Sequence, residues 1–341
     1  RLQVHGSHYE AGFAIGSRFA AQISRTLESY SFFQEQLLPY HRSPEGQARN
    51  QELQELNRAH YPDIFAELEG LAEGSGQPFD ELFLVNMRGE YQGYLHSLSR
   101  GCSDCSVLTR GAALIGHNED GAPSFADNLY VVHAQIEGKP AFTALSYPGF
   151  LCGNAIGFNA EGVCFSVDHV RPKHLKVGLG RHFIARSLLE AGSLDDAIRR
   201  VTVPARASGF SYTIGSIAER RVVQVEVAPE SQHVLEIRGA HFHANHYLEL
   251  AAVAQIIEPS SRARVDRARV ILQRGDPADA GEVLSILGDQ QGEQYPLYRT
   301  AAPPDTYVTL CTALFDLDAR LLRIYTGHPT KAPGRFIVLG L

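Results

Sequence analysis

The amino-acid sequence predicts an α+β fold in which two antiparallel sheets are stacked between helical layers, an αββα sandwich. Before about residue 100, apolar residues recur at helical spacing, whereas much of the later chain has short strand patterns separated by turn residues. The later helical stretches come in blocks between groups of strands. Blocks of this kind favour antiparallel sheets with helices packed outside them over a parallel sheet built from βαβ units.

The predicted elements follow in chain order from periodicity and turn residues. Helical spacing covers residues 9–30 and 61–72, and Asp80 is a candidate N-cap for a helix over 81–87. Turn residues separate pairs of strands that we expect to form hairpins: 129–136 with 141–147, 210–217 with 222–227, and 307–317 with 321–325. A further strand is expected over 162–167, and helices over 181–191, 195–201 (after Ser193 as N-cap) and 260–273. We interpret the charged face of the last helix as mostly solvated surface.

The composition excludes several classes of function. A chain of 341 residues with 44% hydrophobic and 20% charged residues is typical of a globular protein with a sizeable core. The net charge of −7 argues against nucleic acid as a partner, and no apolar run is long enough to cross a membrane. Five cysteines without regular spacing do not indicate a disulfide framework. We expect a cytoplasmic protein with a small-molecule partner, in a monomer or a homo-oligomer, although a leader could precede Arg1.

The pair Gly101-Cys102 is the main candidate for chemistry. Cys102 stands before a strand-like run, and a turn at Arg110-Gly111 predicts a hairpin that returns Asp120 to it. A thiol attacks a carbonyl as the thiolate, so it needs a nearby base or positive charge. If the bond before Cys102 is cut, the new α-amine, with a pKa near ~8, can be that base, and Asp120 can orient it. Without such neighbours, a lone cysteine is more often structural.

The second candidate is the run His241-Phe242-His243-Ala244-Asn245-His246. At strand spacing, His241 and His243 share one face while His246 points away, and no HExxH pattern is present. We therefore expect neither a metal nor a cofactor. The side-chain amide of Asn245 could instead donate a hydrogen bond to an oxyanion. An equally good interpretation is that Asn245 is only a turn or strand-end residue. Arg299, in an aromatic-rich loop, could hold Asp120 and Cys102 in place or be a surface arginine.

Together these segments resemble the penicillin acyltransferase (isopenicillin N acyltransferase-like) family of N-terminal nucleophile hydrolases. The resemblance spans nearly the whole chain and is carried by motifs in the family's order: Gly6-Ser7-His8-Tyr9-Glu10-Ala11-Gly12, Tyr61-Pro62, Glu69-Gly70-Leu71-Ala72, Asn86-Met87-Arg88-Gly89-Glu90, Gly101-Cys102-Ser103, His117-Asn118-Glu119-Asp120, Gly157-Phe158-Asn159-Ala160-Glu161-Gly162-Val163 and His243-Ala244-Asn245-His246. It implies self-cleavage before Cys102 into an α chain (1–101) and a β chain (102–341) that stay together.

The resemblance also implies a role for each matching residue. Cys102 would be the nucleophile and, through its freed amine, the base; Asp120 would hold that amine or thiol. Asn245 would donate to the oxyanion, and Arg299 would support the site. The rival Cys105 fits less well, because it follows an aspartate instead of glycine. The implied reaction is cleavage of a small N-acyl amide, such as a β-alanyl conjugate, through an acyl thioester, by hydrolysis or by acyl transfer.

The sequence does not identify the substrate, and it leaves two alternatives to this function. Residues 121–128 and 147–153 are expected to line the substrate pocket, without a match to a particular family member. A protein that keeps the fold but is never cut and only binds a ligand is the main alternative. A metallohydrolase that uses the histidine run is a weaker one.

Overall fold

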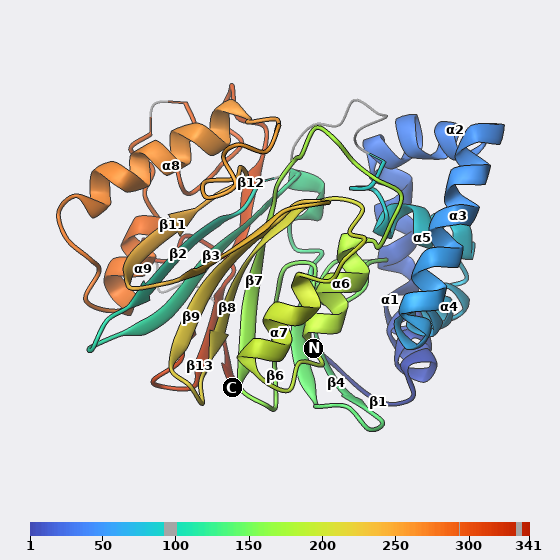
Figure 1. Ribbon diagram of the computed structural model, residues 1–341, viewed down its shortest axis with the longest axis horizontal. Helices are drawn as coiled ribbons and strands as arrows, with labels where there is room; N and C mark the ends of the chain where they lie inside the picture. The colour runs from blue at the N-terminus through green and yellow to red at the C-terminus, as the bar shows by residue number, and fades with distance from the viewer. Residues whose placement is uncertain (92–100, 293, 332–335) are drawn as a thin grey trace.

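The computed structural model describes residues 1–91, 101–292, 294–331 and 336–341. Two sheets lie face to face in its middle, and helices cover their outer sides (Figure 1). The eight-stranded sheet has the order β1-β4-β5-β6-β7-β8-β9-β10, and the six-stranded sheet has the order β11-β2-β3-β12-β13-β14. The predicted α+β class and αββα sandwich are confirmed.

The strands of the eight-stranded sheet are β1 (Leu2–Gly6), β4 (Tyr130–Ile136), β5 (Phe142–Ser146), β6 (Ile156–Asn159), β7 (Val163–His169), β8 (Phe210–Ser216), β9 (Arg221–Val227) and β10 (Gln232–Glu236). Those of the six-stranded sheet are β2 (Ser103–Leu108), β3 (Ala113–Gly121), β11 (Gly239–His243), β12 (Val308–Asp316), β13 (Leu321–Tyr325) and β14 (Phe336–Gly340). The hairpins β4–β5, β8–β9 and β12–β13 match the predicted ones within a few residues.

The helices lie in two stretches of the chain, one before Cys102 and one after it. Those before the first cysteine are α1 (His8–Ser29), α2 (Leu38–His41), α3 (Pro44–His60), α4 (Pro62–Ser75) and α5 (Phe79–Asn86), with a π-helical turn η1 (Phe33–Leu37). Beyond it lie η2 (Pro123–Phe125), α6 (Arg181–Leu188), α7 (Leu194–Val201), α8 (Pro259–Leu272) and α9 (Ala280–Leu287). Figure 1 shows α8 and α9 outside the six-stranded sheet, and α6 and α7 against the eight-stranded sheet.

Several details differ from the sequence prediction. The segment before residue 101 is not purely helical, because β1 joins the eight-stranded sheet and pairs parallel with β4. Helix α5 begins at Phe79 after Pro78, so Asp80 is not the N-cap but lies in the first turn, where its charge favours the helix dipole. Helix α3 was not predicted, because its buried positions include a glycine and two asparagines and give a weak apolar stripe.

The two predicted chains share one core. A single cluster of buried apolar side chains runs from Val4 to Ile324 and includes residues on both sides of Cys102. A buried ion pair adds to it, since Arg186 of α6 donates to Glu67 of α4 at 2.7 Å. A cut before Cys102 would therefore leave the two fragments bound to each other.

Over the described residues, no helix combines the length and apolar character needed to cross a bilayer.

Candidate active site

The candidate site is built on the hairpin of β2 and β3. The two strands pair antiparallel, with Ser103 opposite Asn118 and Asp104 opposite His117. The hairpin predicted around residues 110 and 111 is confirmed, and β12 pairs with the other edge of β3. Cys102 directly precedes β2, so the hairpin brings the end of β3 back to the predicted nucleophile.

The polar run of β3 is divided between two environments, because side chains alternate across a strand. His117 and Glu119 share the face that meets the eight-stranded sheet, together with Asp104, which accepts hydrogen bonds from hydroxyls of β7 and β8. Asn118 and Asp120 share the opposite face, where the amide of Asn118 donates to the last carbonyl of α9 at 2.8 Å. All five residues, Asp104 of β2 and the four of β3, are buried. Both faces of β3 therefore carry buried polar side chains.

The thiol of Cys102 belongs to the first of these environments. Its sulfur and one ligand atom each of His117 and Glu119 lie within 4.8 Å of one another. His117 is held between Asp104 Oδ1 at 2.6 Å and Glu119 Oε2 at 3.0 Å. Burial lowers the pKa of His117, but the charge of Asp104 and the hydrogen bonds outweigh this and hold the pKa well above its ordinary value.

The same surroundings disfavour the thiolate form of Cys102. Burial and then the charge of Glu119 raise the pKa of the Cys102 thiol, and a hydrogen bond from His117 offsets only part of that shift. A reactive thiolate is therefore not preformed here. Turnover of an external substrate therefore requires a base, and the α-amine freed by a cut before Cys102 is the group expected to supply it.

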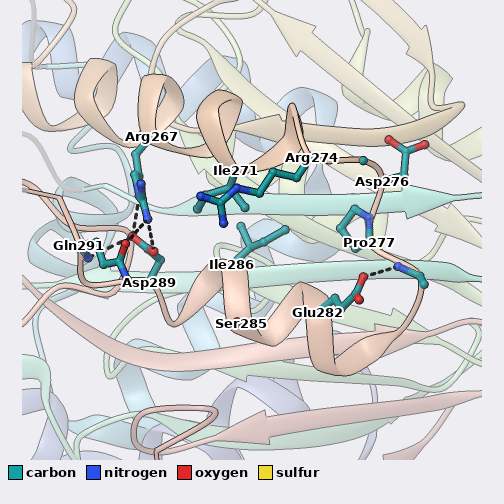
Figure 2. Close-up of a pocket in the computed structure, with 12 residues that line it drawn as sticks. Arg267, Ile271, Arg274, Asp276, Pro277, Glu282, Ser285, Ile286, Asp289 and Gln291 are labelled. Atoms are coloured by element: carbon teal, nitrogen blue, oxygen red, sulfur yellow. Dashed lines mark hydrogen bonds and ion pairs between the residues drawn. The ribbon is translucent and has the colours of Figure 1, made fainter.

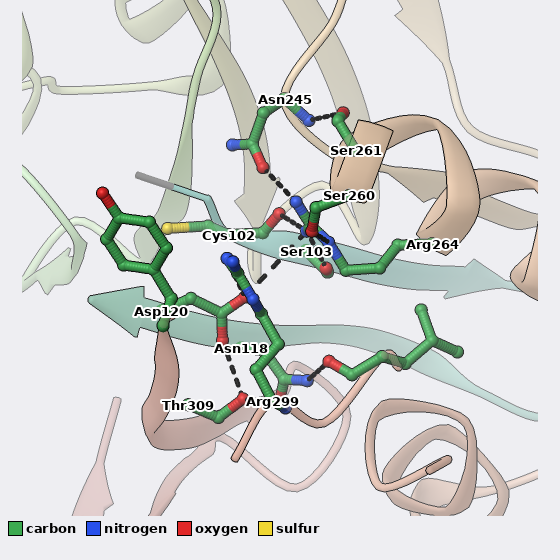
Figure 3. Close-up of polar contacts among 12 residues, drawn as sticks. Cys102, Ser103, Asn118, Asp120, Asn245, Ser260, Ser261, Arg264, Arg299 and Thr309 are labelled. Carbon is green, nitrogen blue, oxygen red and sulfur yellow. Dashed lines mark hydrogen bonds and ion pairs between the residues drawn. The ribbon is translucent and has the colours of Figure 1, made fainter. Parts of the chain in front are cut away.

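The backbone of Cys102 is held from the other side by Arg264 of α8 (Figure 3). Its Nη1 donates to the carbonyl oxygen of Cys102 at 2.5 Å and to Ser103 Oγ at 2.6 Å, and its Nη2 donates to Asn245 Oδ1 at 2.6 Å. Burial, and then Arg299, lower the pKa of Arg264 to about 10. The interpretation of this helix as having a solvated charged face thus does not extend to Arg264, which is only 1% exposed.

Asp120 lies beside this arginine on the outer face of β3. Its Oδ1 accepts a hydrogen bond from Thr309 Oγ1 at 2.7 Å, and its Oδ2 is 3.5 Å from Arg299 and 4.0 Å from Arg264. Within the described part of the chain, Oδ2 has no hydrogen-bond donor although it is buried. Burial raises the pKa of Asp120 to about 6, because the two arginines offset only part of the desolvation.

Arg299 is a buried residue of the site. Its guanidinium donates to Asp305 through Nε at 2.8 Å and through Nη2 at 2.5 Å, which leaves Nη1 toward Asp120. The surface-arginine alternative is therefore excluded, since Arg299 is 4% exposed. A Cβ added at Gly101 would lie 3.0 Å from Arg299 Nη1, 2.7 Å from Arg264 Nη2 and 2.6 Å from Asn245 Oδ1. Any side chain at the position before Cys102 would therefore displace at least one of these groups.

Asn245 links the nucleophile to the eight-stranded sheet. Its Oδ1 accepts from Arg264, and its Nδ2 donates to the backbone carbonyl of His169 at 3.0 Å. The backbone amide of Asn245 donates to Ser261 Oγ at 2.8 Å. These contacts fix the side-chain amide, and the second hydrogen on Nδ2 has no partner among the described residues. That hydrogen is the donor available for an oxyanion.

The histidine run does not converge on one point. His243 is held between Asp168 Oδ2 at 2.7 Å and Glu226 Oε1 at 3.1 Å, while His246 Nδ1 is 2.7 Å from Ser261 Oγ. Over the described residues, the groups whose ligand atoms lie close enough together for a metal are found instead around His117: Cys102 with His117 and Glu119, and Asp104 with His117 and Asp168. The metal alternative that rests on the histidine run therefore loses its geometric basis.

Sequence reasoning brought together the residues of the outer face but missed others. Gly101, Asp120, Asn245 and Arg299 do lie around the backbone of Cys102. The roles of Arg264, His117 and Glu119 were not predicted. The four consecutive polar residues 117–120 in an otherwise apolar strand could have indicated His117 and Glu119. No such signal marked Arg264, because it is one of several arginines in its helix.

A separate surface pocket of about 540 Å³ lies between α8 and α9. Figure 2 shows Arg267 on its wall, paired with Asp289 at 2.9 and 2.6 Å. The pocket shares no lining residue with the candidate site. Helix α8 therefore presents one arginine to the nucleophile and another to this groove.

Comparisons with known proteins find the following similar chains. The model of the acyl-coenzyme A:6-aminopenicillanic acid acyl-transferase family matches residues 107–331. A beta-alanyl-dopamine/carcinine hydrolase of Drosophila melanogaster is 28% identical over 97% of this chain and 93% of its own. The 40 kDa form of acyl-coenzyme A:6-aminopenicillanic-acid-acyltransferase from Emericella nidulans is 23% identical over 84% of this chain and 81% of its own. The solved structure of a Caenorhabditis elegans ortholog of N-acylethanolamine-hydrolyzing acid amidase aligns with a TM-score of 0.44 and 10% identity, over 63% of this chain and 93% of that chain.

Proposed function

The chain belongs to the acyl-coenzyme A:6-aminopenicillanic acid acyl-transferase family, whose relatives named above are amide hydrolases and acyltransferases, and we propose that it is a self-processing cysteine amidohydrolase. It cuts its own Gly101–Cys102 bond and then cleaves small N-acyl amides through an acyl thioester on Cys102. The observation that carries the proposal is the setting of this bond. Arg264 donates a hydrogen bond to the carbonyl oxygen of Cys102, and Gly101 is packed against Asn245.

Self-cleavage begins with attack of the Cys102 sulfur on the carbonyl carbon of Gly101. The thiol proton passes to the departing backbone nitrogen, which becomes the α-amine of Cys102, and the acyl chain moves to sulfur as a thioester. Water then adds its hydroxyl to the Gly101 carbonyl carbon and returns a proton to sulfur, which leaves a carboxylate at residue 101. The buried Oδ2 of Asp120 accepts no hydrogen bond from the described residues and is 3.5 Å from Arg299 Nη1, which supports this scheme, because the new α-ammonium can donate to it.

Turnover repeats the chemistry on an external amide. The free α-amine of Cys102 takes the thiol proton, and the thiolate attacks the substrate carbonyl. The second hydrogen of Asn245 Nδ2 stabilises the oxyanion, a contribution of about 3 kcal/mol for one such donor. The α-ammonium returns the proton to the departing amine, and water resolves the thioester. Arg299 acts through Asp120, which it holds in place.

The proposal is tested by trapping the acyl group on Cys102. Purified protein is mixed with a series of amides of one chromogenic arylamine, whose acyl groups include β-alanyl and simple alkanoyl groups. β-Lactams are tested as a second class of substrate. Mass spectrometry of the 102–341 fragment should then show the acyl adduct on Cys102, removable by hydroxylamine. The Cys102→Ala variant should lack both adduct and amine release. A wild-type protein that releases no amine from any of these amides would refute the proposed function.

A further inference from the structure

Three side chains of the kinds that bind metal ions meet on one face of the hairpin of β2 and β3. The antiparallel register of the two strands, continued by one residue, puts Cys102 opposite Glu119. His117 lies two residues before Glu119 and therefore on the same face. The Cys102 sulfur and one ligand atom each of His117 and Glu119 lie within 4.8 Å of one another, and all three residues are buried. One hairpin thus brings a thiol, an imidazole and a carboxylate together.

The spacing of these ligand atoms is close to that of a tetrahedral zinc site. Zinc bonds of about 2.0–2.1 Å to nitrogen or oxygen and about 2.3 Å to sulfur put neighbouring ligand atoms about 3.3–3.6 Å apart. His117 Nε2 is 3.0 Å from Glu119 Oε2, and the Cys102 sulfur is within 4.8 Å of a ligand atom of each. Side-chain shifts of about 1 Å therefore suffice to place an ion between them. The ion takes the place of protons that these atoms carry, so it requires no separate cavity.

The groups behind two of these side chains orient them as the outer shell of a metal site does. His117 Nδ1 is 2.6 Å from Asp104 Oδ1, and this contact leaves Nε2 for an ion. The other oxygen of Asp104 accepts hydrogen bonds from hydroxyls of β7 and β8 at 2.9 and 2.6 Å. Glu119 Oε1 accepts a hydrogen bond from Tyr147 Oη at 2.5 Å, which leaves Oε2 for an ion. One nitrogen and one oxygen are thus held in place for a metal.

The charges on this face of the hairpin also favour a divalent cation. One ligand atom each of Asp104, His117 and Asp168 lie within 4.8 Å of one another. Asp168 pairs with His243 through Oδ2, while its Oδ1 is buried and accepts no hydrogen bond from the described residues. With Glu119, three carboxylates face two imidazoles, and His243 also contacts a fourth carboxylate on β9. Because unpaired buried charge is costly, a cation among these groups is stabilised.

We propose that Cys102, His117 and Glu119 form a Zn²⁺ site in which a bound ion blocks the nucleophile. The ion binds the sulfur, Nε2 of His117 and Oε2 of Glu119, and a water molecule completes the tetrahedron. Two protons pass to the solvent, one from the thiol and one from the hydrogen bond between His117 and Glu119. Two positive charges thus leave as one Zn²⁺ arrives, and the net charge of the site does not change.

The expected consequence is reversible inhibition, and this part of the inference rests on the proposed function. A sulfur that shares its electron pair with zinc is a weak nucleophile, so neither self-cleavage nor turnover proceeds while the ion is bound. All three ligands belong to the 102–341 fragment, so the site is present before and after the cut. Removal of the ion by a chelator should restore both reactions.

The first test measures metal binding without an activity assay, with Co²⁺ as a spectroscopic substitute for Zn²⁺. Chelator-treated, reduced protein is titrated with Co²⁺, and coordination by sulfur should produce a thiolate-to-cobalt charge-transfer band that one equivalent of Zn²⁺ abolishes. Cys102→Ala should lose the band, and Glu119→Gln should bind Zn²⁺ at least about tenfold more weakly. Cys105→Ala is the matched control and should keep the band, because Cys105 is buried in the apolar cluster on the other face of the hairpin.

The second test measures amine release by the wild type with Zn²⁺, with Mg²⁺ and after chelation. Zn²⁺ should abolish release and the chelator should restore it, whereas Mg²⁺, which prefers oxygen ligands, should have no effect. A wild type without the cobalt band, or a band that persists in Cys102→Ala, overturns the site and leaves the proposed function intact. Full amidase activity of the zinc-bound protein overturns the blocking role. A protein that shows the band but hydrolyses no amide with or without zinc refutes the proposed function and leaves the zinc site standing.

Discussion

Replacement of Gly101 by alanine tests the packing on which self-cleavage depends. The added Cβ would lie 2.6 Å from Asn245 Oδ1 and 2.7 Å from Arg264 Nη2, both too close for carbon. These atoms cannot simply turn away, because Asn245 is also fixed by its bond to His169 and Arg264 by its bond to the carbonyl of Cys102. An extra methyl in a packed interior costs about 1–3 kcal/mol. We expect this strain to displace the groups that hold the bond to be cut.

If the whole cost falls on the cleavage step, Gly101→Ala slows self-cleavage by roughly 5- to 150-fold. The assay follows a pulse-labelled chain from cell-free translation and quantifies the intact chain and the 102–341 fragment with time. Gly111→Ala is the matched control, since a Cβ there meets no atom within 4 Å and cleavage should keep the wild-type rate. Cleavage of Gly101→Ala at the rate of this control would refute the reasoning.

Two further predictions concern the stability of the uncut chain, measured by urea unfolding in the Cys102→Ala background. Arg264→Met should lower the free energy of unfolding by about 3 kcal/mol or more, because the buried carbonyl oxygen of Cys102, Asn245 Oδ1 and Asp120 lose a partner. The control is Arg262→Met, on the exposed side of the same helix, which should change the free energy of unfolding little. Equal effects of the two substitutions would contradict the assigned contacts. Burial raises the folded pKa of Asp120 from 3.8 to about 6, so the folded state binds this proton more tightly. Its contribution to stability is therefore present below pH ~4 and lost as the pH rises through about 6. Asp120→Asn should remove that loss, and an unchanged pH profile would refute the assignment.

The sequence predicted what depends on local patterns. Turn residues at 137–140 and 219–221 placed the hairpins β4–β5 and β8–β9, and the capping role of Ser193 is confirmed by its bond to the backbone of Asp196. The hairpin of β2 and β3 likewise followed from the turn at 110–111. The strands β10 and β14 were not predicted, because both are edge strands whose alternating burial is shallow.

The parts of the site that the sequence did not predict depend on contacts between distant elements. Arg264 reaches Cys102 only because α8 packs outside the six-stranded sheet, and no local pattern separates it from its exposed neighbour Arg262. Strand alternation does place His117 and Glu119 on one face of β3. Which face meets the second sheet is decided by the packing of the two sheets, however, and that packing turns the thiol of Cys102 toward Glu119.

The most direct test of the account is the intact mass of the purified wild-type protein under denaturing conditions. We predict two species that divide between residues 101 and 102, with cysteine as the first residue of the larger one. The Cys102→Ala variant should give a single uncut chain. Under native conditions the two wild-type fragments should elute together, because they share one core. A single uncut wild-type chain that still hydrolyses amides, or cleavage that persists in Cys102→Ala, would contradict the central claim.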